Sequence, residues 1–335
     1  MSRSSRTGDA IRVGVLGFGR WGRTWLPVLE AEPDVEVVAV AGGLSGATGP
    51  SGASSHPTLR TGVRHVGRWE DALDDLDAVL VTLPVPLHLA AAREAAARGL
   101  HVLLEKPAVL ARGELAALED VAARAPGVVM VCQNYRERPW ARRVRAELTT
   151  LGPLTHVTVE IARRELLDGG RGALAHPLLD DLAIHHVDLL RHLTGQEAEV
   201  LAATSSRPPW TSYDGTPDAA ALLRLSGGAT VAMHGTWAAR GRETPYDGDW
   251  TFRGERGLVE VRDLAVLRDD QVVAPARAVT PGVHDDTDLA DVLRTFLAGI
   301  AGVPVPTDVA EHARSLRLLL DLRDATGLPP LGDAT

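Results

Sequence analysis

Residues 11–22 read Ile-Arg-Val-Gly-Val-Leu-Gly-Phe-Gly-Arg-Trp-Gly, a β-branched run that leads into three glycines with the spacing G-x-G-x-x-G. Gly17 permits a tight turn, Gly19 lets a phosphate approach bare backbone, and Gly22 lets a helix pack closely on the strand. The N-terminus of that helix offers free N–H groups to an anion. The stretch therefore predicts a strand, a turn and a helix that bind the pyrophosphate of a dinucleotide.

Apolar runs alternate with helical patterns over the first part of the chain. The runs expected to form buried strands are residues 11–16, 35–40, 78–83, 101–104 and 128–131. Repeated strand–helix units with buried strands predict a parallel, doubly wound sheet. We therefore expect an α/β protein with a Rossmann domain at residues 11–132, preceded by a disordered tail at residues 1–10.

The pattern changes after about residue 150. Partial period-2 alternation, interrupted by glycine and proline turns, marks residues 155–163, 199–204, 220–225, 230–237 and 258–261 as strands. Such alternation is typical of antiparallel sheets. Residues 133–335 are accordingly expected to form a second α/β domain, with a large, open, mostly antiparallel sheet and helices at the C-terminal end.

Composition excludes several classes of protein. The net charge of −9 argues against a nucleic-acid partner. No run approaches the ~20 apolar residues that a membrane span requires. The single cysteine, Cys132, cannot form an internal disulfide, which suits a reducing compartment and predicts a cytoplasmic protein.

The end of the second expected strand bears on the choice of cofactor. An acid is expected there to hold the adenosine ribose, but the sequence places Gly42 and no Asp or Glu nearby. A pocket without the acid leaves room for a 2′-phosphate, to which Ser45 could donate and which Arg60 could reach. We therefore expect NADP or NAD, with NADP slightly preferred.

The lysine at position 106 is the only lysine among the 35 Lys and Arg residues of the chain. Arginine is never deprotonated in proteins, whereas a lysine can exchange a proton and act as a compact charge beside a substrate oxygen. Lys106 follows the apolar run at residues 101–104, and ligands of open α/β sheets lie at the carboxyl ends of strands. A leftover surface lysine is the alternative.

A proline-shaped turn follows the strand expected at residues 78–83. Its sequence, Thr-Leu-Pro-Val-Pro-Leu-His at residues 82–88, can line the nicotinamide-ribose pocket through Leu83, Pro84 and His88. Taken alone, an ordinary strand-to-helix connection is the favoured interpretation.

Four polar residues recur at helical spacing further along the chain: Asp181, His185, Asp188 and His192. On a helix these positions share one narrow stripe. The stripe could be a solvated face, a metal site that needs ligands from another element, or an acid–base pair in which Asp181 orients His185. Lys106 and the glycine loop favour the pair, and we expect no metal.

Together, these motifs resemble the Gfo/Idh/MocA family of oxidoreductases. The resemblance runs from the glycine loop through the turn ending at His88 and the Glu105-Lys106-Pro107 tripeptide to the Asp-x-x-x-His of Asp181 and His185. It implies NAD(P)-dependent hydride transfer to or from a sugar, inositol or related polyol. It also implies a homodimer or homotetramer formed through the C-terminal sheet.

The resemblance also implies the site. Lys106, Asp181 and His185 are the expected catalytic set, with Lys106 stabilising the reacting oxygen and His185 moving the proton. The expected substrate contacts are Tyr135, Arg136 and Trp237. The expected cofactor contacts are Gly17, Phe18, Gly19, Arg20, Trp21, Gly22, Gly42, Ser45, Leu83, Pro84, His88, Glu105, Lys106 and Gln133.

Two other functions use the same fold. One is a redox-assisted lyase or glycosidase with tightly held NAD, which would use the same residues. The other is a non-catalytic dinucleotide-binding regulator, which has no need of Lys106 or of the Asp181–His185 pair.

Overall fold

The computed structural model describes residues 10–43, 59–164, 174–276 and 287–327. Ser45 and residues 1–9 of the expected N-terminal tail therefore lie outside the described residues. The chain forms two compact units. The first comprises residues 1–132 and 286–311, and the second comprises residues 133–285 and 312–335.

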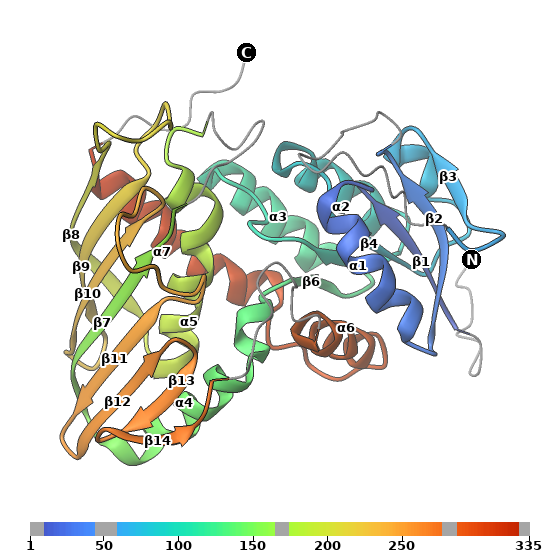
Figure 1. The fold of residues 1–335 in the computed structure, drawn as a ribbon. Helices are drawn as coiled ribbons and strands as arrows, with labels where there is room; N and C mark the ends of the chain where they lie inside the picture. The colour runs from blue at the N-terminus through green and yellow to red at the C-terminus, as the bar shows by residue number, and fades with distance from the viewer. Residues whose placement is uncertain (1–9, 44–58, 165–173, 277–286, 328–335) are drawn as a thin grey trace. The chain divides into compact units, whose positions relative to one another are not determined.

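The first unit contains a six-stranded parallel sheet (Figure 1). Its strands are β1 (Ile11–Leu16), β2 (Val35–Ala41), β3 (Arg64–Val66), β4 (Ala78–Val81), β5 (His101–Leu104) and β6 (Val129–Val131). They lie in the order β3-β2-β1-β4-β5-β6, which is that of a doubly wound dinucleotide-binding fold. The expected Rossmann sheet is confirmed.

Burial explains why the strands of this sheet read as continuous apolar runs. All four residues of β4 are buried, as are the last three of β5. Helices cover both faces of such a sheet, so neither face can be polar. The helices of this unit are α1 (Arg20–Ala31), α2 (His88–Ala97), α3 (Arg112–Arg124) and α6 (Thr287–Ile300), with 3-10 turns η1 (Trp69–Ala72) and η2 (Val85–Leu87).

Helix α6 belongs to the first unit although it follows the second unit in the sequence. Its Leu293 and Phe296 are 2% exposed and share one hydrophobic cluster with Leu29 of α1 and Leu103 of β5. Burying a side chain of this size contributes about 1.5–3 kcal/mol. The sequence had suggested that all the C-terminal helices belong to the second domain, so the structure differs here.

The second unit is built on an eight-stranded sheet. Its strands are β7 (Leu154–Ala162), β8 (Ala198–Ser206), β9 (Asp218–Leu225), β10 (Thr230–Thr236), β11 (Asp249–Gly254), β12 (Gly257–Arg262), β13 (Ala265–Arg268) and β14 (Gln271–Ala274). The order is β14-β13-β12-β11-β7-β10-β9-β8, and every neighbouring pair except β7–β10 is antiparallel. The expected mostly antiparallel sheet is confirmed.

Helices line one face of this second sheet, as Figure 1 shows for α4 and α5. Val157, Val159 and Ile161 of β7 are buried, while the residues between them are more exposed, as period-2 alternation requires. The helical elements are η3 (Asn134–Glu137), α4 (Pro139–Leu151), the π-helical η5 (Leu178–Leu182), α5 (Ala183–Thr194) and, from His312 onward, α7 (Val309–Ala325). Within the described ranges, no helix has the length and apolar character needed to cross a membrane.

Candidate functional site

Two glycines of the loop after β1 are required by packing within the protein. Gly17 has a φ of +106°, and a Cβ added there would lie 2.6 Å from the backbone nitrogen of Leu83. A Cβ at Gly22 would lie 2.2 Å from the carbonyl oxygen of Gly17. Any side chain at these positions would therefore displace backbone.

Gly19 is different. No described atom beyond its chain neighbours lies within 4 Å of the place a Cβ would take, and its φ of −81° suits any residue. It is the N-cap of α1, and its neighbours provide no side-chain cap for this helix end. Because packing does not explain a glycine here, the open backbone fits the pyrophosphate of a dinucleotide, which helix N-termini bind well.

The other loop residues lie around this position. Phe18 is buried, and the guanidinium of Arg20 lies 5.9 Å from the centre of the Trp21 ring. Register pairs Leu16 with Val81 across β1 and β4, and Val81 with Leu104 across β4 and β5. Three segments therefore leave the sheet at the same edge, directly after β1, β4 and β5: the glycine loop, the proline turn and the Glu105-Lys106 peptide.

The end of β2 contains no acid. Gly42 and Gly43 have φ values of +79° and +75°. A Cβ added at Gly43 would lie 2.2 Å from the Phe18 carbonyl oxygen. A Cβ added at Gly42 would have no described atom within 4 Å beyond its chain neighbours. Arg60, expected to reach a phosphate here, instead pairs with Glu30 of α1 at 3.3 Å.

His88 joins two strand-end loops. Its Nε2 lies 2.7 Å from the Leu83 carbonyl oxygen, and its Nδ1 lies 3.1 Å from the Pro107 carbonyl oxygen. Burial lowers the pKa of His88, so the ring is neutral at pH 7 and donates one N–H, which suits the shorter contact. His88 thus holds the turn containing Leu83 and Pro84 against the segment that follows Lys106.

Glu105 is buried directly after β5. Its Oε1 accepts a hydrogen bond of 2.7 Å from the Trp25 indole N–H, and its Oε2 accepts one of 3.1 Å from the Lys106 backbone N–H. Burial raises the pKa of Glu105, while the Trp25 hydrogen bond and the Lys106 charge oppose the shift. Two hydrogen bonds therefore fix the peptide from which the half-buried Lys106 side chain extends.

Gln133 follows the last strand of the first sheet. It is 2% exposed, and its Nε2 lies 2.9 Å from Nδ1 of His312 on α7. The donor is the amide, because an amide nitrogen can only donate. The side chain of Gln133 is thus oriented by a neighbouring histidine, and its contact with a cofactor stays a prediction.

The Asp-x-x-x-His motif starts in a π-helical turn. Asp181 lies in η5, and His185 lies in the first turn of α5, which begins at Ala183. The expectation that Asp181 shares one regular α-helical stripe with His185 is therefore wrong, because the π turn changes the phase before α5. The two residues still lie in consecutive turns.

His185 is held by an aromatic stack. Its ring lies 3.9 Å from that of Tyr135 with an angle of 7° between the planes. The guanidinium of Arg138 lies 3.5 Å from the centre of the Tyr135 ring, and Arg138 pairs with the buried Asp247. Stacking fixes the plane of the imidazole ring, which a proton-transferring histidine requires.

Asp188 is paired with an arginine and is not one of a cluster of metal ligands among the described residues. Its two carboxylate oxygens accept hydrogen bonds of 2.6 Å from Nη2 and Nε of Arg136, and Ser315 donates a third of 2.7 Å. Arg136, which the sequence predicts to contact the substrate, is 5% exposed. Its guanidinium instead forms a buried pair with Asp188 that joins η3 to α5. The described residues contain no cluster of three or more His, Cys, Asp or Glu able to hold a metal ion.

Trp237 follows β10 and is 2% exposed. Its ring centre lies 6.3 Å from that of Tyr213, and its indole N–H has no hydrogen-bond partner among the described residues. A buried indole N–H usually finds an acceptor. A substrate hydroxyl could supply that acceptor.

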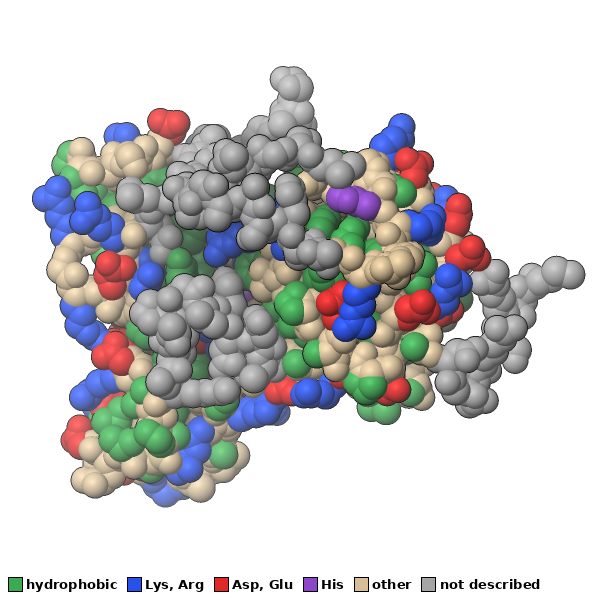
Figure 2. Space-filling view, turned by 45° about the vertical axis from the view of Figure 1, so that its right-hand side comes forward, with side chains coloured by type: hydrophobic (Ala, Val, Ile, Leu, Met, Phe, Trp, Pro, Cys, Tyr) green, Lys and Arg blue, Asp and Glu red, His purple; other side chains and the backbone are tan. Residues whose placement is uncertain are grey.

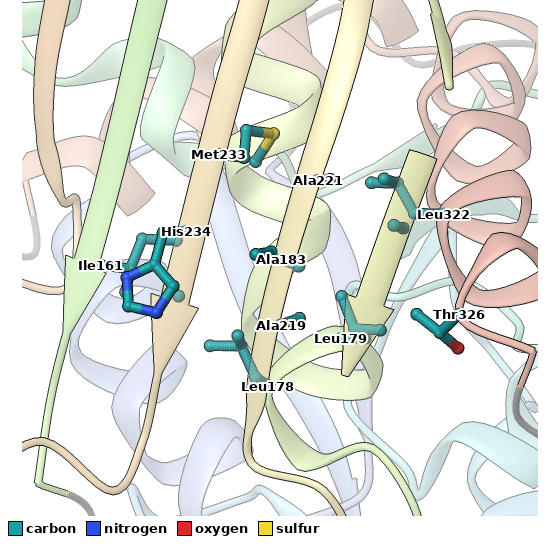
Figure 3. A pocket seen from close by; sticks show the side chains of 13 residues that line it. Ile161, Leu178, Leu179, Ala183, Ala219, Ala221, Met233, His234, Leu322 and Thr326 are labelled. Carbon is teal, nitrogen blue, oxygen red and sulfur yellow. The ribbon is translucent and has the colours of Figure 1, made fainter. Parts of the chain in front are cut away.

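The apolar cavity in Figure 3 is not a candidate active site. It measures about 30 Å³ and lies between the second sheet and its helices, with Leu178, Met233 and Leu322 among the labelled side chains. Its lining is almost entirely apolar, so it offers no set of polar groups that could orient a substrate.

Charged side chains of both signs lie on the face of the molecule that Figure 2 shows. On the face shown in Figure 2, acidic and basic side chains lie intermingled.

Comparison with known families covers both units. Residues 11–133 match a family model described as an oxidoreductase family with an NAD-binding Rossmann fold, and residues 142–260 match the GFO/IDH/MocA C-terminal domain. The chain is 28% identical to the rhizopine catabolism protein MocA of Rhizobium meliloti, over 75% of this chain and 78% of that protein.

Two further proteins are similar to this chain. The D-xylose 1-dehydrogenase (NADP(+)) 2 of Haloferax volcanii is 36% identical over 42% of this chain and 45% of its own length. The crystal structure of an oxidoreductase from Agrobacterium radiobacter, in complex with NAD+, L-tartaric acid and magnesium, has a TM-score of 0.80 at 16% identity. That comparison covers 95% of this chain and 96% of the other, and it shows a shared fold.

Proposed function

The chain belongs to the Gfo/Idh/MocA family of oxidoreductases, and we propose that it transfers hydride between a nicotinamide cofactor and a CH–OH group of a sugar, inositol or related polyol. The observation that carries the proposal is the single lysine of the chain, fixed beside a buried glutamate at the edge of the sheet that also presents Gly19. Relatives that include a D-xylose dehydrogenase support the substrate class.

Lys106 is assigned to the reacting oxygen. A bound nicotinamide would accept or supply the hydride. The ammonium group of Lys106 donates to the substrate oxygen and stabilises the negative charge that develops on it. The backbone hydrogen bond to Glu105 holds this residue in place, so little reorganisation accompanies the reaction.

His185 is assigned to the proton. In oxidation it takes the proton from the substrate hydroxyl, and in reduction it returns it. The Tyr135 stack fixes its plane, and the carboxylate of Asp181, one turn earlier, stabilises the imidazolium that forms. Tyr135 and Trp237 remain the proposed substrate contacts, whereas Arg136 is assigned to hold α5 through Asp188.

The proposed cofactor contacts are those of the glycine loop, the end of β2 and the loops after β4 and β5. NADP is proposed to bind at least as well as NAD, because the end of β2 carries Gly42 where an acid would favour NAD. A relative whose name specifies NADP(+) supports this choice.

A homo-oligomer formed through the second sheet is also part of the proposal. Leu201 of β8 and Leu222 of β9 are each 41% exposed. Burial of such side chains against a second copy would remove them from water. Light scattering on the wild type and on Leu222→Glu tests this, with a smaller particle expected for the variant.

A turnover assay with a panel of sugars and polyols tests the function. Nicotinamide absorbance is followed with NAD+ and NADP+, in parallel with Lys106→Ala as the inactive control. Turnover that Lys106→Ala abolishes supports the proposal. Cofactor binding without turnover on any substrate would indicate a regulator, and product formation without net cofactor reduction would indicate a redox-assisted lyase.

A further inference from the structure

The side chain of Arg23 reaches the end of β2, where the cofactor fingerprint would place a ribose-binding acid. It sits in the first turn of α1, and its Nη2 donates a hydrogen bond of 3.3 Å to the carbonyl oxygen of Gly43, just past the end of β2. Its guanidinium lies 5.7 Å from the centre of the Phe18 ring. These two contacts hold the charged group over the end of the second strand.

The charge of Arg23 is not neutralised by any of the described residues. Among the described residues no carboxylate pairs with it, and its buried Nε has no hydrogen-bond acceptor. Arg60, by contrast, pairs with Glu30. A partly buried guanidinium with unused donors is a site for an anion.

His65 of β3 contacts the same strand end. Its Nε2 lies 2.8 Å from the Gly42 carbonyl oxygen, so Nε2 carries the proton. Its ring meets the Phe18 ring edge-on, with the centres 5.9 Å apart. Arg23 and His65 therefore contact the same phenylalanine and bond adjacent glycine carbonyls.

The backbone between them leaves room for a ligand. Nothing lies within 4 Å of the Cβ position at Gly42. An aspartate or glutamate at this place would accept hydrogen bonds from both ribose hydroxyls and would repel a 2′-phosphate, whereas an arginine accommodates the phosphate.

We propose that Arg23, assisted by His65, binds the 2′-phosphate of NADP(H) and sets the preference of this protein for the phosphorylated cofactor. The inference rests on the proposed dinucleotide-dependent function. It replaces Arg60, which the sequence had suggested, because the side chain of Arg60 is engaged by Glu30 on the exposed side of α1.

Binding of two nucleotide fragments tests the assignment without any turnover. Calorimetry on the full-length protein compares 2′,5′-ADP, which carries the additional phosphate, with 5′-AMP. The wild type should bind 2′,5′-ADP more tightly. In Arg23→Gln the ratio of the two affinities should fall about tenfold or more, the scale of one lost charge-assisted contact. Arg60→Gln is the matched control and should keep the wild-type ratio.

A gain-of-function variant completes the test. Gly42→Asp should reverse the ratio, because the carboxylate repels the 2′-phosphate and accepts from the ribose hydroxyls. Thermal denaturation of each variant establishes that it is folded, and His65→Asn provides a second, smaller loss if Arg23→Gln does not fold.

Each outcome decides the matter. Equal affinity of the wild type for the two fragments, or an Arg23→Gln ratio equal to that of the wild type, would overturn the role of Arg23 while leaving dinucleotide binding intact. If the protein binds neither fragment and neither NAD+ nor NADP+, both this assignment and the proposed function fail.

Discussion

Trp25 and Glu105 are hydrogen-bonded to each other inside the first unit, with 2.7 Å between the indole nitrogen and Oε1. Trp25 is 0% exposed and Glu105 is 5% exposed. The pair connects the helix that follows the glycine loop to the peptide that carries Lys106, and it spans 80 residues of sequence. This buried hydrogen bond thus links α1, whose N-terminus is proposed to bind the cofactor, to the peptide of Lys106, which is proposed to bind the reacting oxygen.

Replacing Trp25 by Phe should damage both stability and turnover. The ring volume is largely retained, but Glu105 loses a donor, and an unsatisfied buried acceptor costs about 1–3 kcal/mol. Urea denaturation measures the stability, and kcat measures the positioning of Lys106. The matched control is Trp69→Phe, since Trp69 is a half-buried tryptophan of the same unit and is not among the proposed cofactor contacts. Equal effects of the two variants on kcat would contradict the positioning role of Trp25.

Two glycine variants should separate binding from folding. Gly19→Val meets no described atom within 4 Å, so the fold should persist while dinucleotide binding is lost. Gly22→Val places a Cβ 2.2 Å from the Gly17 carbonyl oxygen and should lower the melting temperature as well. Calorimetry with NADP+ and thermal denaturation are the measurements. Unchanged cofactor affinity in a folded Gly19→Val protein would contradict the assignment of the loop.

Lys106→Arg should be nearly as damaging as Lys106→Ala. The guanidinium fork is bulkier than an ammonium and cannot lose its proton. We expect a loss on the order of 10²-fold in kcat, the scale of removing one electrostatic or acid–base element. His185→Ala should show a comparable loss, and the double variant should fall short of additivity if both serve one step. Wild-type turnover by Lys106→Arg would show that the chemistry lies elsewhere.

Asp180 should make stability fall as the pH rises. Burial raises the pKa of Asp180 to about 6, against the opposing charge of Arg323 at 3.2 Å. In the unfolded chain the pKa is about 4, so the folded state binds the proton more tightly. The contribution is fully present below about pH 4 and is lost as the pH rises through about 6, by roughly 2–3 kcal/mol.

Asp180→Asn isolates this effect, because the amide does not titrate and other groups cancel in the difference. The stability of the wild type relative to Asp180→Asn should decrease between about pH 4 and pH 7. The changed surroundings of Arg323 in the variant add a constant offset that does not alter the slope. A flat or rising difference would contradict the raised pKa.

The strands that the sequence predicted well are those with β-branched apolar runs. Strand β3 (Arg64–Val66) was missed because it is short and polar. Strand β11 (Asp249–Gly254) was missed although its buried Trp250 and Phe252 alternate with more exposed residues. The hairpin of β13 and β14 turns at Asp269 and Asp270, whose positive φ values of 47° and 65° suit Asn or Gly better.

The candidate site was predictable where its signal is local. The glycine loop and the Glu105-Lys106 peptide each follow an apolar run, which places them at a strand end. The partners were not predictable, because Arg136 and Asp188 lie 52 residues apart and either could have been a surface charge. The π turn at residues 178–182 was also not predictable, because a sequence pattern does not distinguish a π turn from an α turn.

The return of α6 to the first sheet affects the order in which the protein can mature during translation. Val13 and Met130 pack with Leu289 and Phe296, which the ribosome adds more than 150 residues after the last strand of that sheet. At about 5–20 residues per second this delay is roughly 10–30 s. Throughout that interval an apolar face of the nascent cofactor-binding unit lacks its covering helix. An expression plasmid that stops after residue 132 would produce a sheet with this face permanently exposed.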